Sequence, residues 1–472
     1  MTDHIKVDLC VIGGGSGGLS VAAGAVQMGA SVVLVEGGKM GGDCLNYGCV
    51  PSKALIAAAK HAHAMTTGAP FGITPVDPEI NFAAAKDHVR SVIAGIEPHD
   101  SVERFESLGV QVIQDWGKFT SPSELQAGGK TIQARRFVIA TGSSPFVPPI
   151  PGLEDVPHYT NETIFDLRER PRHLIVVGGG PIGMEMAQAH RRLGCEVTVI
   201  EGATVLGKDD PELAAVALSA IRAEGVEIVE NAAVEQVRKA GDDITVSTSD
   251  GREFTGSHIL VAVGRKPNTG TLNLDAAGVE TNRAGVIVDA SLKTSNRKIY
   301  AIGDVAGGKQ FTHLAGYHAG IVIRSALFGL PAKASDTNIP HATYTDPEIA
   351  QIGLTEAQAR EEHGDALEVL RFQFAENDRA RAEGVSAGLV KVMVVKGRPV
   401  GAGIVGPQAG EQISLWSLAI SSKLKIGAVA GMVAPYPTLM EVSKRAGGQY
   451  YTPRLFENKW VKKVVGLVQK LP

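Results

Sequence analysis

The 472-residue sequence predicts an α/β fold that contains two similar strand–turn–helix–strand units. Three observations support this prediction. The length suits about three domains of ~150 residues. The chain is rich in glycine, with 56 residues, and one glycine-containing motif occurs twice. The first copy comprises a strand at 7–12, the turn Gly13-x-Gly15-x-x-Gly18, a helix at 19–28 and a strand at 31–35 followed by Glu36. The second comprises a strand at 173–177, the turn Gly178-x-Gly180-x-x-Gly183, a helix to about residue 193 and a strand at 196–200 followed by Glu201.

Each copy is typical of a Rossmann-like dinucleotide-binding domain. A single G-x-G-x-x-G turn is weak support, but strand, glycines, helix, second strand and terminal acid together are specific. The glycines let the backbone approach a pyrophosphate at the helix N-terminus. Glu36 and Glu201 are placed to accept hydrogen bonds from ribose hydroxyls. Two copies therefore predict two bound dinucleotides.

Composition and charge narrow the class of protein further. The formal net charge of −4 gives no general attraction to nucleic acid. No apolar run reaches the ~18 residues that a membrane span needs, and the first residues lack the pattern of a signal peptide. Only four cysteines in so long a chain favour a reducing, cytoplasmic location. Cys10 and Cys195 fall in apolar strand runs, where we expect small buried side chains rather than reactive groups.

The other two cysteines lie in the run Gly41-Gly42-Asp43-Cys44-Leu45-Asn46-Tyr47-Gly48-Cys49-Val50-Pro51-Ser52-Lys53. The C-x4-C spacing is too wide for half of a zinc knuckle, and no second Cys/His pair follows, so no metal site is predicted. A bridge across so few residues adds little loop entropy, which favours a chemical use over a pair of structural thiols. We expect a helix to continue from residue 54 to residue 64.

This run resembles the redox-active disulfide of the flavoprotein disulfide reductases, the group of dihydrolipoamide dehydrogenase, glutathione reductase and mercuric reductase. The resemblance implies that the first unit binds FAD and that the second binds the nicotinamide cofactor. It further implies that Cys49 is the thiolate next to the flavin and that Cys44 is the exposed interchange thiol. Lys53 would lie beside the flavin and pair with Glu185, which falls just inside the second helix.

The resemblance extends to other cofactor positions along the chain. The strand at 137–142 ends in the turn Ala140-Thr141-Gly142, which in this family returns the chain to FAD, and Gly264-Arg265 closes the second unit. The strand at 299–304 ends in a second FAD fingerprint, with Asp304 expected on the ribityl chain. Besides the glycines and acids of the two turns and Lys53, the residues that the resemblance assigns to cofactor binding are Gly42, Thr141, Gly142, Gly264, Arg265, Gly303, Asp304 and His313.

The acid at the end of the second unit favours NADH over NADPH. Glu201 would bond the ribose hydroxyls and repel a 2′-phosphate. No arginine lies between Glu201 and Arg222, so the usual phosphate clamp is missing, and Lys208 is the nearest cation.

The resemblance covers nearly the whole chain and divides it into four segments. They are an FAD-binding part at 1–150, an NAD-binding domain at 151–270 that opens with a linker at 148–167, a second FAD-binding part at 271–338 and an α+β interface domain at 339–472. Such an interface domain implies a homodimer whose active site borrows residues from the partner subunit.

One departure from the family pattern lies near the C-terminus. The best-known members carry a His-Pro-T-x-x-E run there, with the histidine facing the cysteines of the other subunit. Here Tyr436 occupies the histidine position and Glu441 the glutamate position, and no histidine follows His363. An imidazole exchanges protons near neutral pH, whereas a phenol with a pKa near ~10 is a poor base. Tyr436 then either positions a ligand or is a packed aromatic.

This departure keeps several functions open. The sequence favours an FAD-dependent reductase that passes electrons from NADH through the Cys44–Cys49 disulfide to a disulfide substrate, as dihydrolipoamide dehydrogenase-like enzymes do in reverse. A mercuric reductase-like metal reductase is disfavoured because the last cysteine is Cys195 and no metal-binding domain precedes the first strand. A quinone reductase and a slowly turning-over flavoprotein attached to a membrane are further alternatives.

The C-terminal segment is amphipathic at helical spacing. Apolar residues share one face, namely Trp460, Val461, Val464, Val465, Leu467, Val468 and Leu471. Lysines lie on the other, namely Lys459, Lys462, Lys463 and Lys470. A basic amphipathic helix can lie on a membrane surface, but the sequence favours a helix docked on its own dimer.

Overall fold

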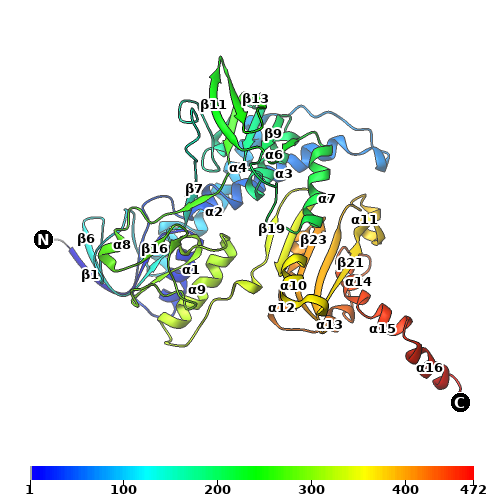
Figure 1. Ribbon diagram of the computed structural model, residues 1–472. Coiled ribbons are helices and arrows are strands. Elements are labelled where there is room, and N and C mark those ends of the chain that lie inside the picture. Colours follow the sequence, from blue (N-terminus) through cyan, green and yellow to red (C-terminus); the bar gives the residue numbers. More distant parts are fainter. Residues whose placement is uncertain (1–2, 472) are drawn as a thin grey trace. The chain divides into compact units, whose positions relative to one another are not determined.

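The computed structural model describes residues 3–471, which form two compact units (Figure 1). The first unit comprises the chain up to Thr67 together with Pro75–Gly202 and Val229–Asp336. The second comprises Gly68–Thr74, Ala203–Ile228 and the chain from Thr337 onward. The predicted α/β class, with an α+β domain at the C-terminal end, is confirmed.

A seven-stranded sheet organises the first unit. Its central strand β1 (Asp3–Ile12) pairs in parallel with β2 (Val32–Val35) and β6 (Lys130–Ile139), and Ile12 lies opposite both Val35 and Ile139. These strands therefore end together at the edge where the first glycine turn begins. The other members are β3 (Gln111–Ile113), β4 (Lys118–Ser121), β5 (Glu124–Ala127) and β18 (Ile299–Ala301), which pairs in parallel with β6.

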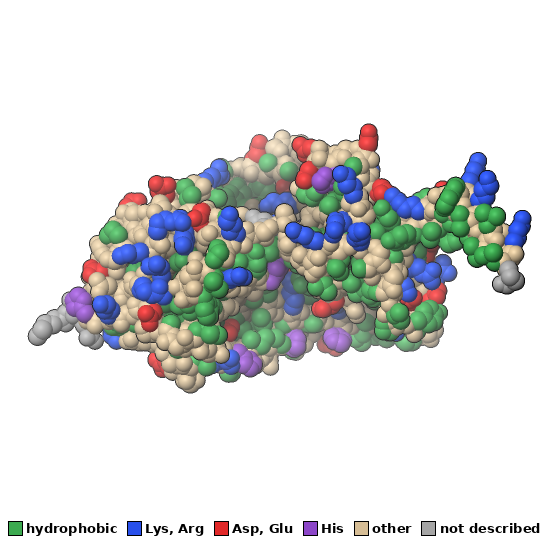
Figure 2. All heavy atoms as spheres, turned by 90° about the horizontal axis from the view of Figure 1, so that it is seen from below, with side chains coloured by type: hydrophobic (Ala, Val, Ile, Leu, Met, Phe, Trp, Pro, Cys, Tyr) green, Lys and Arg blue, Asp and Glu red, His purple; other side chains and the backbone are tan. Residues whose placement is uncertain are grey.

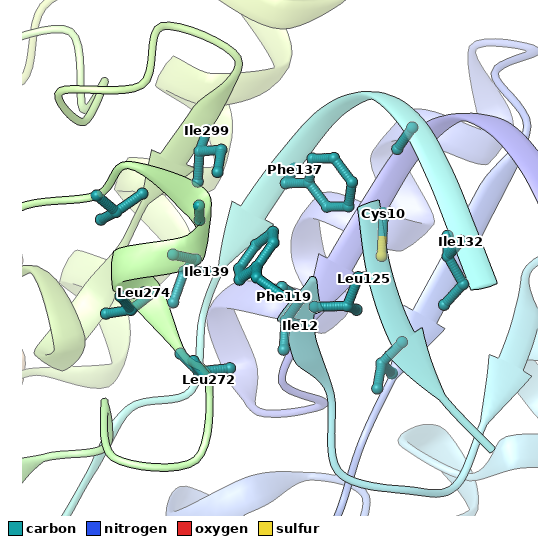
Figure 3. Close-up of a cluster of buried hydrophobic side chains, with 14 of the residues drawn as sticks. Cys10, Ile12, Phe119, Leu125, Ile132, Phe137, Ile139, Leu272, Leu274 and Ile299 are labelled. Carbon is teal, nitrogen blue, oxygen red and sulfur yellow. The ribbon is translucent and has the colours of Figure 1, made fainter. Parts of the chain in front are cut away.

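Side chains that alternate along β1 are buried on both faces of this sheet. Cys10 and Ile12 lie in the cluster shown in Figure 3, together with Phe119 and Phe137, whose rings pack edge to face at 5.3 Å. Leu9 and Val11 face the opposite way and pack with α1 (Ser16–Gln27) and α9 (Thr312–Ala326). Cys10 is fully buried, as predicted, and burial raises the pKa of its thiol.

The second glycine unit has its own parallel sheet in the order β10-β9-β8-β14. Its strands are β8 (His173–Val177), β9 (Glu196–Ile200), β10 (Glu227–Val229) and β14 (His258–Val261), with α6 (Pro181–Arg192) between β8 and β9. A three-stranded sheet adjoins it, made of β11 (Val234–Ala240), β12 (Asp243–Thr248) and β13 (Glu253–Gly256).

The segment predicted as a linker at 148–167 packs on this second sheet. Leu153 and Val156 are buried in its core, and the Tyr159 N–H donates to the carbonyl of Ile259 at 2.8 Å. The segment ends in the short helix η3 (Ile164–Asp166). It is therefore an integral part of the nucleotide-binding unit rather than a free connection.

The second unit is built on a five-stranded antiparallel sheet in the order β19-β20-β23-β22-β21. Its strands are β19 (His341–Thr343), β20 (Glu348–Gly353), β21 (Leu367–Gln373), β22 (Leu389–Val395) and β23 (Arg398–Gly406). Helix α12 (Ala409–Ser421) covers one face and buries Trp416, whose indole N–H donates to the Ser443 hydroxyl at 3.0 Å.

An ion-pair network fixes α7 (Pro211–Ala223) to this sheet within the second unit. The Lys391 ammonium, on β22, is 4% exposed and lies 2.8 Å from Asp210, 2.9 Å from Glu212 and 2.7 Å from Glu356. Arg371 binds the carboxylates of Glu212 and Glu356 as well, at 3.0 and 2.6 Å. Each buried charge is thereby matched by an opposite one.

The remaining elements are shorter or peripheral. The helices are α2 (Gly42–Asn46), α3 (Cys49–Thr66), η1 (Ala69–Phe71), α4 (Phe82–Ile96), η2 (Glu97–His99), α5 (Val102–Ser107), α8 (Leu274–Ala277), η4 (Gly303–Ala306), η5 (Asp336–Asn338), α10 (Glu356–His363), η6 (Gly364–Ala366), η7 (Phe374–Glu376), α11 (Asp378–Ala382), α13 (Ile426–Ala430), α14 (Glu441–Gln449), α15 (Thr452–Phe456) and α16 (Lys459–Val468). The strands are β7 (Ser143–Pro145) with its partner β15 (Arg265–Pro267), and β16 (Thr281–Asn282) with β17 (Gly285–Val286). Among the described residues, no helix is long and apolar enough to cross a bilayer.

Candidate active site

The two glycine turns have the same geometry. Gly13 and Gly178 have φ values of +111° and +110°. A Cβ atom at either would lie 2.3 or 2.6 Å from the carbonyl oxygen of Ala140 or Ala262, so only glycine fits. The turns lead directly into α1 and α6, and a Cβ at Gly180 would meet nothing within 4 Å. The N-terminus of α6 thus presents backbone N–H groups with space in front of it, which suits a pyrophosphate.

The acid that ends each second strand closes its turn. The Glu36 carboxylate accepts hydrogen bonds from the backbone N–H groups of Gly14 and Gly38, and Glu201 accepts from Gly179 at 2.7 Å. Both carboxylates therefore lie beside the glycine turn, as the motif predicts. Their bonds to ribose hydroxyls stay predictions.

The cysteine run lies against the first glycine turn. A Cβ atom at Gly42 would be 2.7 Å from the Gly15 Cα, so α2 begins in backbone contact with that turn. The Asn46 amide donates to the carbonyls of Met40 at 3.0 Å and Gly42 at 2.9 Å, which holds the short helix in place. Cys44 lies on α2, and Cys49 is the first residue of α3.

Cys44 and Cys49 are free thiols in the structure, with Cys49 exposed and Cys44 partly buried. Hydrogen bonding by Cys44 lowers the pKa of Cys49 to about 6, assisted by the Thr312 hydroxyl at 3.4 Å and the charge of Lys53, although desolvation and Asp43 oppose the shift. The same bond, with burial, raises the pKa of Cys44. The pair therefore consists of a thiolate at Cys49 and a thiol at Cys44 near neutral pH.

The predicted partnership of Lys53 and Glu185 is present. The Lys53 ammonium, on α3, donates to the Glu185 carboxylate, on α6, at 2.7 Å. The Glu185 side chain is 7% exposed and that of Lys53 is 37% exposed. This pair ties the helix that starts at Cys49 to the helix of the second glycine turn.

An arginine bridges the cysteine run and the second FAD fingerprint. Arg265 contacts the Asp43 carboxylate at 2.9 Å, and its guanidinium donates to the hydroxyl and carbonyl of Ser143, both at 2.7 Å. The Ser143 hydroxyl donates to Asp304 at 2.6 Å, and burial raises the pKa of that carboxyl. Asn161 also donates to Asp43, at 3.2 Å.

Two turns that carry predicted cofactor residues are joined by Asn268. The Thr141 hydroxyl donates to the carbonyl of Asn268 at 2.7 Å, and the Asn268 amide returns a bond to the Thr141 carbonyl at 3.0 Å. The Asn268 N–H donates to the carbonyl of Gly142 at 3.0 Å. Gly264 accepts from the Phe146 N–H at 2.9 Å, which continues the link between the two segments.

The segment that follows the second fingerprint lies next to the cysteines. Thr312, the first residue of α9, contacts Cys49, and the neighbouring rings of Phe311 and His313 stack at 5.2 Å. The Gly303 N–H donates to the Nδ1 of His318 at 3.2 Å. The structure thus gathers Cys44, Cys49, Lys53, Glu185 and the residues predicted to bind cofactors within the first unit.

Tyr436 and Glu441 lie in the second unit. The Tyr436 side chain is 71% exposed, and its hydroxyl donates to the Asp378 carboxylate at 3.1 Å. This hydrogen bond and the negative charge of Asp378 raise the pKa of the phenol. Tyr436 therefore stays protonated at neutral pH and is a hydrogen-bond donor rather than a base.

Sequence reasoning missed Asp43, Ser143 and Thr312. Asp43 stands beside Cys44 in the quoted run, where a charged side chain was a usable signal. Thr312 falls in a segment that the resemblance had marked, but its contact with Cys49 spans 263 residues and has no local signal. Among residues 3–471, no group of three or more His, Cys, Asp or Glu side chains is arranged to hold a metal ion.

Comparisons with known proteins agree with this geometry. The family described as "Pyridine nucleotide-disulphide oxidoreductase" matches residues 7–319, and the dimerisation domain of the same family matches residues 339–446. A mercuric reductase from Lysinibacillus sphaericus is 35% identical over 447 residues, which cover 93% of this chain and 82% of the relative. A dihydrolipoyl dehydrogenase from Geobacillus stearothermophilus is 33% identical over 455 residues, which cover 94% of this chain and 96% of the relative.

A solved structure is similar over the same span. The Cu(II) complex of the HOCl-induced flavoprotein disulfide reductase RclA from Escherichia coli aligns with a TM-score of 0.85 at 27% identity, covering 94% of this chain and 99% of that one. With two family domains matched, and with the cysteine pair lying against a dinucleotide-binding turn, the chain belongs to the pyridine nucleotide-disulphide oxidoreductases, flavoenzymes that use FAD and NAD(P)H.

Proposed function

We propose that this enzyme reduces a disulfide substrate with electrons from NADH, using Cys44 and Cys49 as the exchanging pair. The observation that carries the proposal is the position of the two free thiols, Cys44 on α2 and Cys49 at the start of α3, where α2 is in backbone contact with the first glycine turn. The pKa of Cys49, lowered to about 6, supports it. Bound FAD supplies the two-electron transfer between the nicotinamide and the cysteines. The chain positions the two sulfur atoms and transfers one proton between them and the substrate.

The exchange is balanced in atoms and electrons. As the Cys44 sulfur attacks the substrate disulfide, the Cys49 thiolate accepts the Cys44 proton, and the first substrate sulfur leaves as a thiolate. The first substrate thiolate then takes the proton from Cys49. The Cys49 thiolate so restored attacks the Cys44 sulfur and releases the second substrate thiolate. A hydride from NADH returns the resulting Cys44–Cys49 disulfide to a thiol and a thiolate, so one NADH is consumed per substrate disulfide.

The second glycine unit is proposed as the NADH site. Glu201 lies at the turn, where it accepts from Gly179, and a 2′-phosphate placed there would meet this carboxylate. Accordingly, we assign 1–150 and 271–338 to FAD binding and 151–270 to nicotinamide binding. The matched dimerisation domain supports a homodimer, for which we assign 339–472.

In that homodimer, Tyr436 and Glu441 are proposed to face the partner's cysteines. A protonated Tyr436 has one O–H, which can turn from Asp378 to donate to a bound substrate, but it cannot accept a proton from a thiol at neutral pH. The enzyme would then depend on the Cys44–Cys49 pair for proton handling, which favours substrates that leave as stable thiolates.

A metal-ion reductase is the second candidate, because the chain is 35% identical to a mercuric reductase and similar in structure to a copper-bound relative. A thiol–thiolate pair is also a ligand set for soft ions. Against it, the described second unit holds no cysteine that could deliver an ion to Cys44.

The deciding experiment is anaerobic titration of the flavoprotein with NADH or NADPH, followed by visible absorbance, in wild type and Cys44→Ala. We expect NADH to be the better reductant, and a long-wavelength thiolate–flavin band in wild type after two electrons. Turnover with lipoamide, low-pKa aromatic disulfides, Hg²⁺ and Cu²⁺ then separates the two candidates. Full reduction of the flavin by two electrons, without that band, would rule out the cysteine pair as an electron carrier.

A further inference from the structure

The C-terminal helix α16 presents an uncovered apolar face. No residue of α15 or α16 is buried. Along α16 and the turn after it, the exposed fractions are 73% for Trp460, 62% for Leu467, 58% for Val468 and 69% for Leu471. Figure 2 shows hydrophobic and basic side chains of this C-terminal segment open to solvent. Burying such side chains is favourable, so the face is suited to a partner.

The start of this segment is fixed to the second unit. Arg454, on α15, forms an ion pair with Glu368 of β21 at 2.7 Å, and its guanidinium stacks 3.6 Å from the centre of the Tyr450 ring. Beyond it, the Asn458 side chain caps α16 by accepting from the Trp460 N–H at 2.9 Å. The helix is therefore held at its base and begins by local capping, while its apolar face extends beyond these contacts.

The polar face of the helix is entirely cationic. Its charged residues are Lys459, Lys462 and Lys463, Lys470 follows the helix, and no acidic residue follows Glu457. Four positive charges thus gather in the last fifteen residues of a chain whose net charge is −4. The sequence predicts an amphipathic helix over 459–471, and in the structure α16 runs from Lys459 to Val468.

We propose that α16 binds the surface of an anionic phospholipid bilayer. The ten residues of the helix extend over ~15 Å, about half the ~30 Å hydrocarbon thickness, so the helix lies in the interface plane. Its apolar side chains would enter the boundary between head groups and acyl chains, Trp460 would sit at the head-group level, and the lysines would contact lipid phosphates.

Two other occupants are less well matched. The dimerisation domain of the family ends at residue 446, before α15, so the helix lies outside the shared dimer module. Nucleic acid would pair with the lysines but would leave Trp460, Leu467 and Val468 in water.

Sedimentation of the FAD-loaded enzyme with vesicles tests the proposal. We expect strong binding to phosphatidylcholine vesicles that contain 30% phosphatidylglycerol, weak binding to pure phosphatidylcholine, and loss of binding at high salt. Each lysine near an anionic surface contributes about fivefold in affinity, so Lys462→Gln/Lys463→Gln should bind about 25-fold more weakly. Leu467→Glu should also release the enzyme, because it places a charge in the apolar face.

Lys423→Gln/Lys425→Gln is the matched control. Both lysines are exposed on the second unit, the change in charge is the same, and α16 is untouched. This variant should bind anionic vesicles like wild type. NADH-dependent flavin reduction and dimer mass, measured for every variant, should not change. Equal binding of the α16 and control variants, or loss of the dimer in Leu467→Glu, would overturn the proposal, the latter because it assigns the apolar face to the partner subunit.

Discussion

Lys53 and Glu185 form an ion pair, 2.7 Å long, between the helix of the redox cysteines and the helix of the second glycine turn. The two side chains of this ion pair differ in exposure, since that of Glu185 is nearly buried whereas that of Lys53 is partly open to water. Removing Lys53 leaves a buried carboxylate without this cation, whereas neutralising Glu185 leaves an ammonium that water can solvate. The two substitutions should therefore have unequal effects.

We expect Lys53→Met to lower the free energy of unfolding by about 2 kcal/mol and Glu185→Gln by about 1 kcal/mol or less. Urea unfolding at pH 7, followed by circular dichroism, measures both. His61→Gln, an exposed change on the same helix, is the control and should have little effect. Equal losses of unfolding free energy in the two variants would contradict the argument that the burial of Glu185 makes the two substitutions unequal.

The thiolate at Cys49 predicts a pH dependence. Its pKa is lowered to about 6, mainly by the hydrogen bond from Cys44, so Cys49 of the reduced pair should be mostly thiolate at pH 7. The long-wavelength band of the two-electron-reduced enzyme should be present above pH 6 and fade below it. In Cys44→Ala no disulfide can form, so the band belongs to the enzyme with oxidised flavin, and there its midpoint should lie higher because the main hydrogen bond is gone. In two-electron-reduced Thr312→Val the midpoint should rise by less. An unchanged midpoint in Cys44→Ala would contradict the assignment.

The ion pairs of Lys391 predict how the second unit responds to acid. Burial would raise the pKa of Glu356, but hydrogen bonds from Lys391 and Arg360 outweigh it and lower that pKa to about 2. A lowered carboxyl pKa stabilises the fold above its unfolded value near 4.5, and this stabilisation is lost as the pH falls toward 2. Burial would lower the pKa of Lys391, but its carboxylate partners raise it, so the lysine keeps its charge throughout this range.

We therefore expect the midpoint of urea unfolding to fall steeply between pH 4.5 and pH 2.5 in wild type. Lys391→Met should destabilise the protein at pH 7 by about 3 kcal/mol, because three carboxylates lose their shared cation, and should flatten the dependence on pH. Lys396→Met, on the turn that follows the same strand, provides the control. A slope that Lys391→Met leaves unchanged would assign the acid response to other groups.

Replacement of Tyr436 by histidine tests the missing base. Tyr436→His should raise turnover with dihydrolipoamide or lipoamide by up to ~10²-fold near pH 7, the lower end of the range for general acid–base catalysis. Tyr436→Phe should leave NADH-dependent flavin reduction unchanged, because that half-reaction does not use the phenol. Stopped-flow reduction and steady-state assays separate the two halves. No gain with histidine would place Tyr436 away from the partner's cysteines.

Cofactor preference should follow the charge of Glu201. Glu201→Gln keeps an oxygen that can accept the Gly179 N–H but removes the negative charge that disfavours a 2′-phosphate. The ratio of kcat/KM for NADH to that for NADPH should fall by about tenfold, which corresponds to ~1.4 kcal/mol. Glu36→Gln, at the equivalent position of the first unit, should weaken FAD retention and leave the ratio unaltered. If the NADH to NADPH ratio stays constant in Glu201→Gln, residues other than Glu201 determine the cofactor preference.

Local patterns in the sequence predicted most of the fold and the centre of the site. The two strand–glycine–helix units are encoded by short-range periodicity and by glycines that no other residue can replace, so they are recognisable without a structure. The C-x4-C run identified Cys44 and Cys49, and its resemblance also paired Lys53 with Glu185. The helix expected at 54–64 starts earlier, at Cys49, because Gly48 ends the preceding turn and Pro51 is tolerated in a first helical turn.

Contacts between distant segments could not be predicted in this way. Thr312 reaches Cys49, and Arg265 joins Asp43 to Ser143, across separations that carry no periodic signal. Similarly, the Pro- and acid-rich segment at 148–167 has the composition of a linker but contributes Leu153 and Val156 to a core. Burial of a few apolar side chains outweighs the composition of the segment as a whole.

The contact between Asp210 and Lys391 also constrains how the protein is made on the ribosome. The two residues are 181 positions apart, and at ~5–20 residues per second the ribosome needs roughly 10 to 35 seconds to synthesise the intervening chain. During that interval the nascent α7 has emerged while its sheet does not yet exist, so the apolar side of the helix, with Leu213 and Leu218, is open to chaperones and proteases. A pause in translation inside that stretch would keep the apolar side of α7 exposed for longer. A fragment that ends before residue 391 would leave that side of the helix exposed permanently.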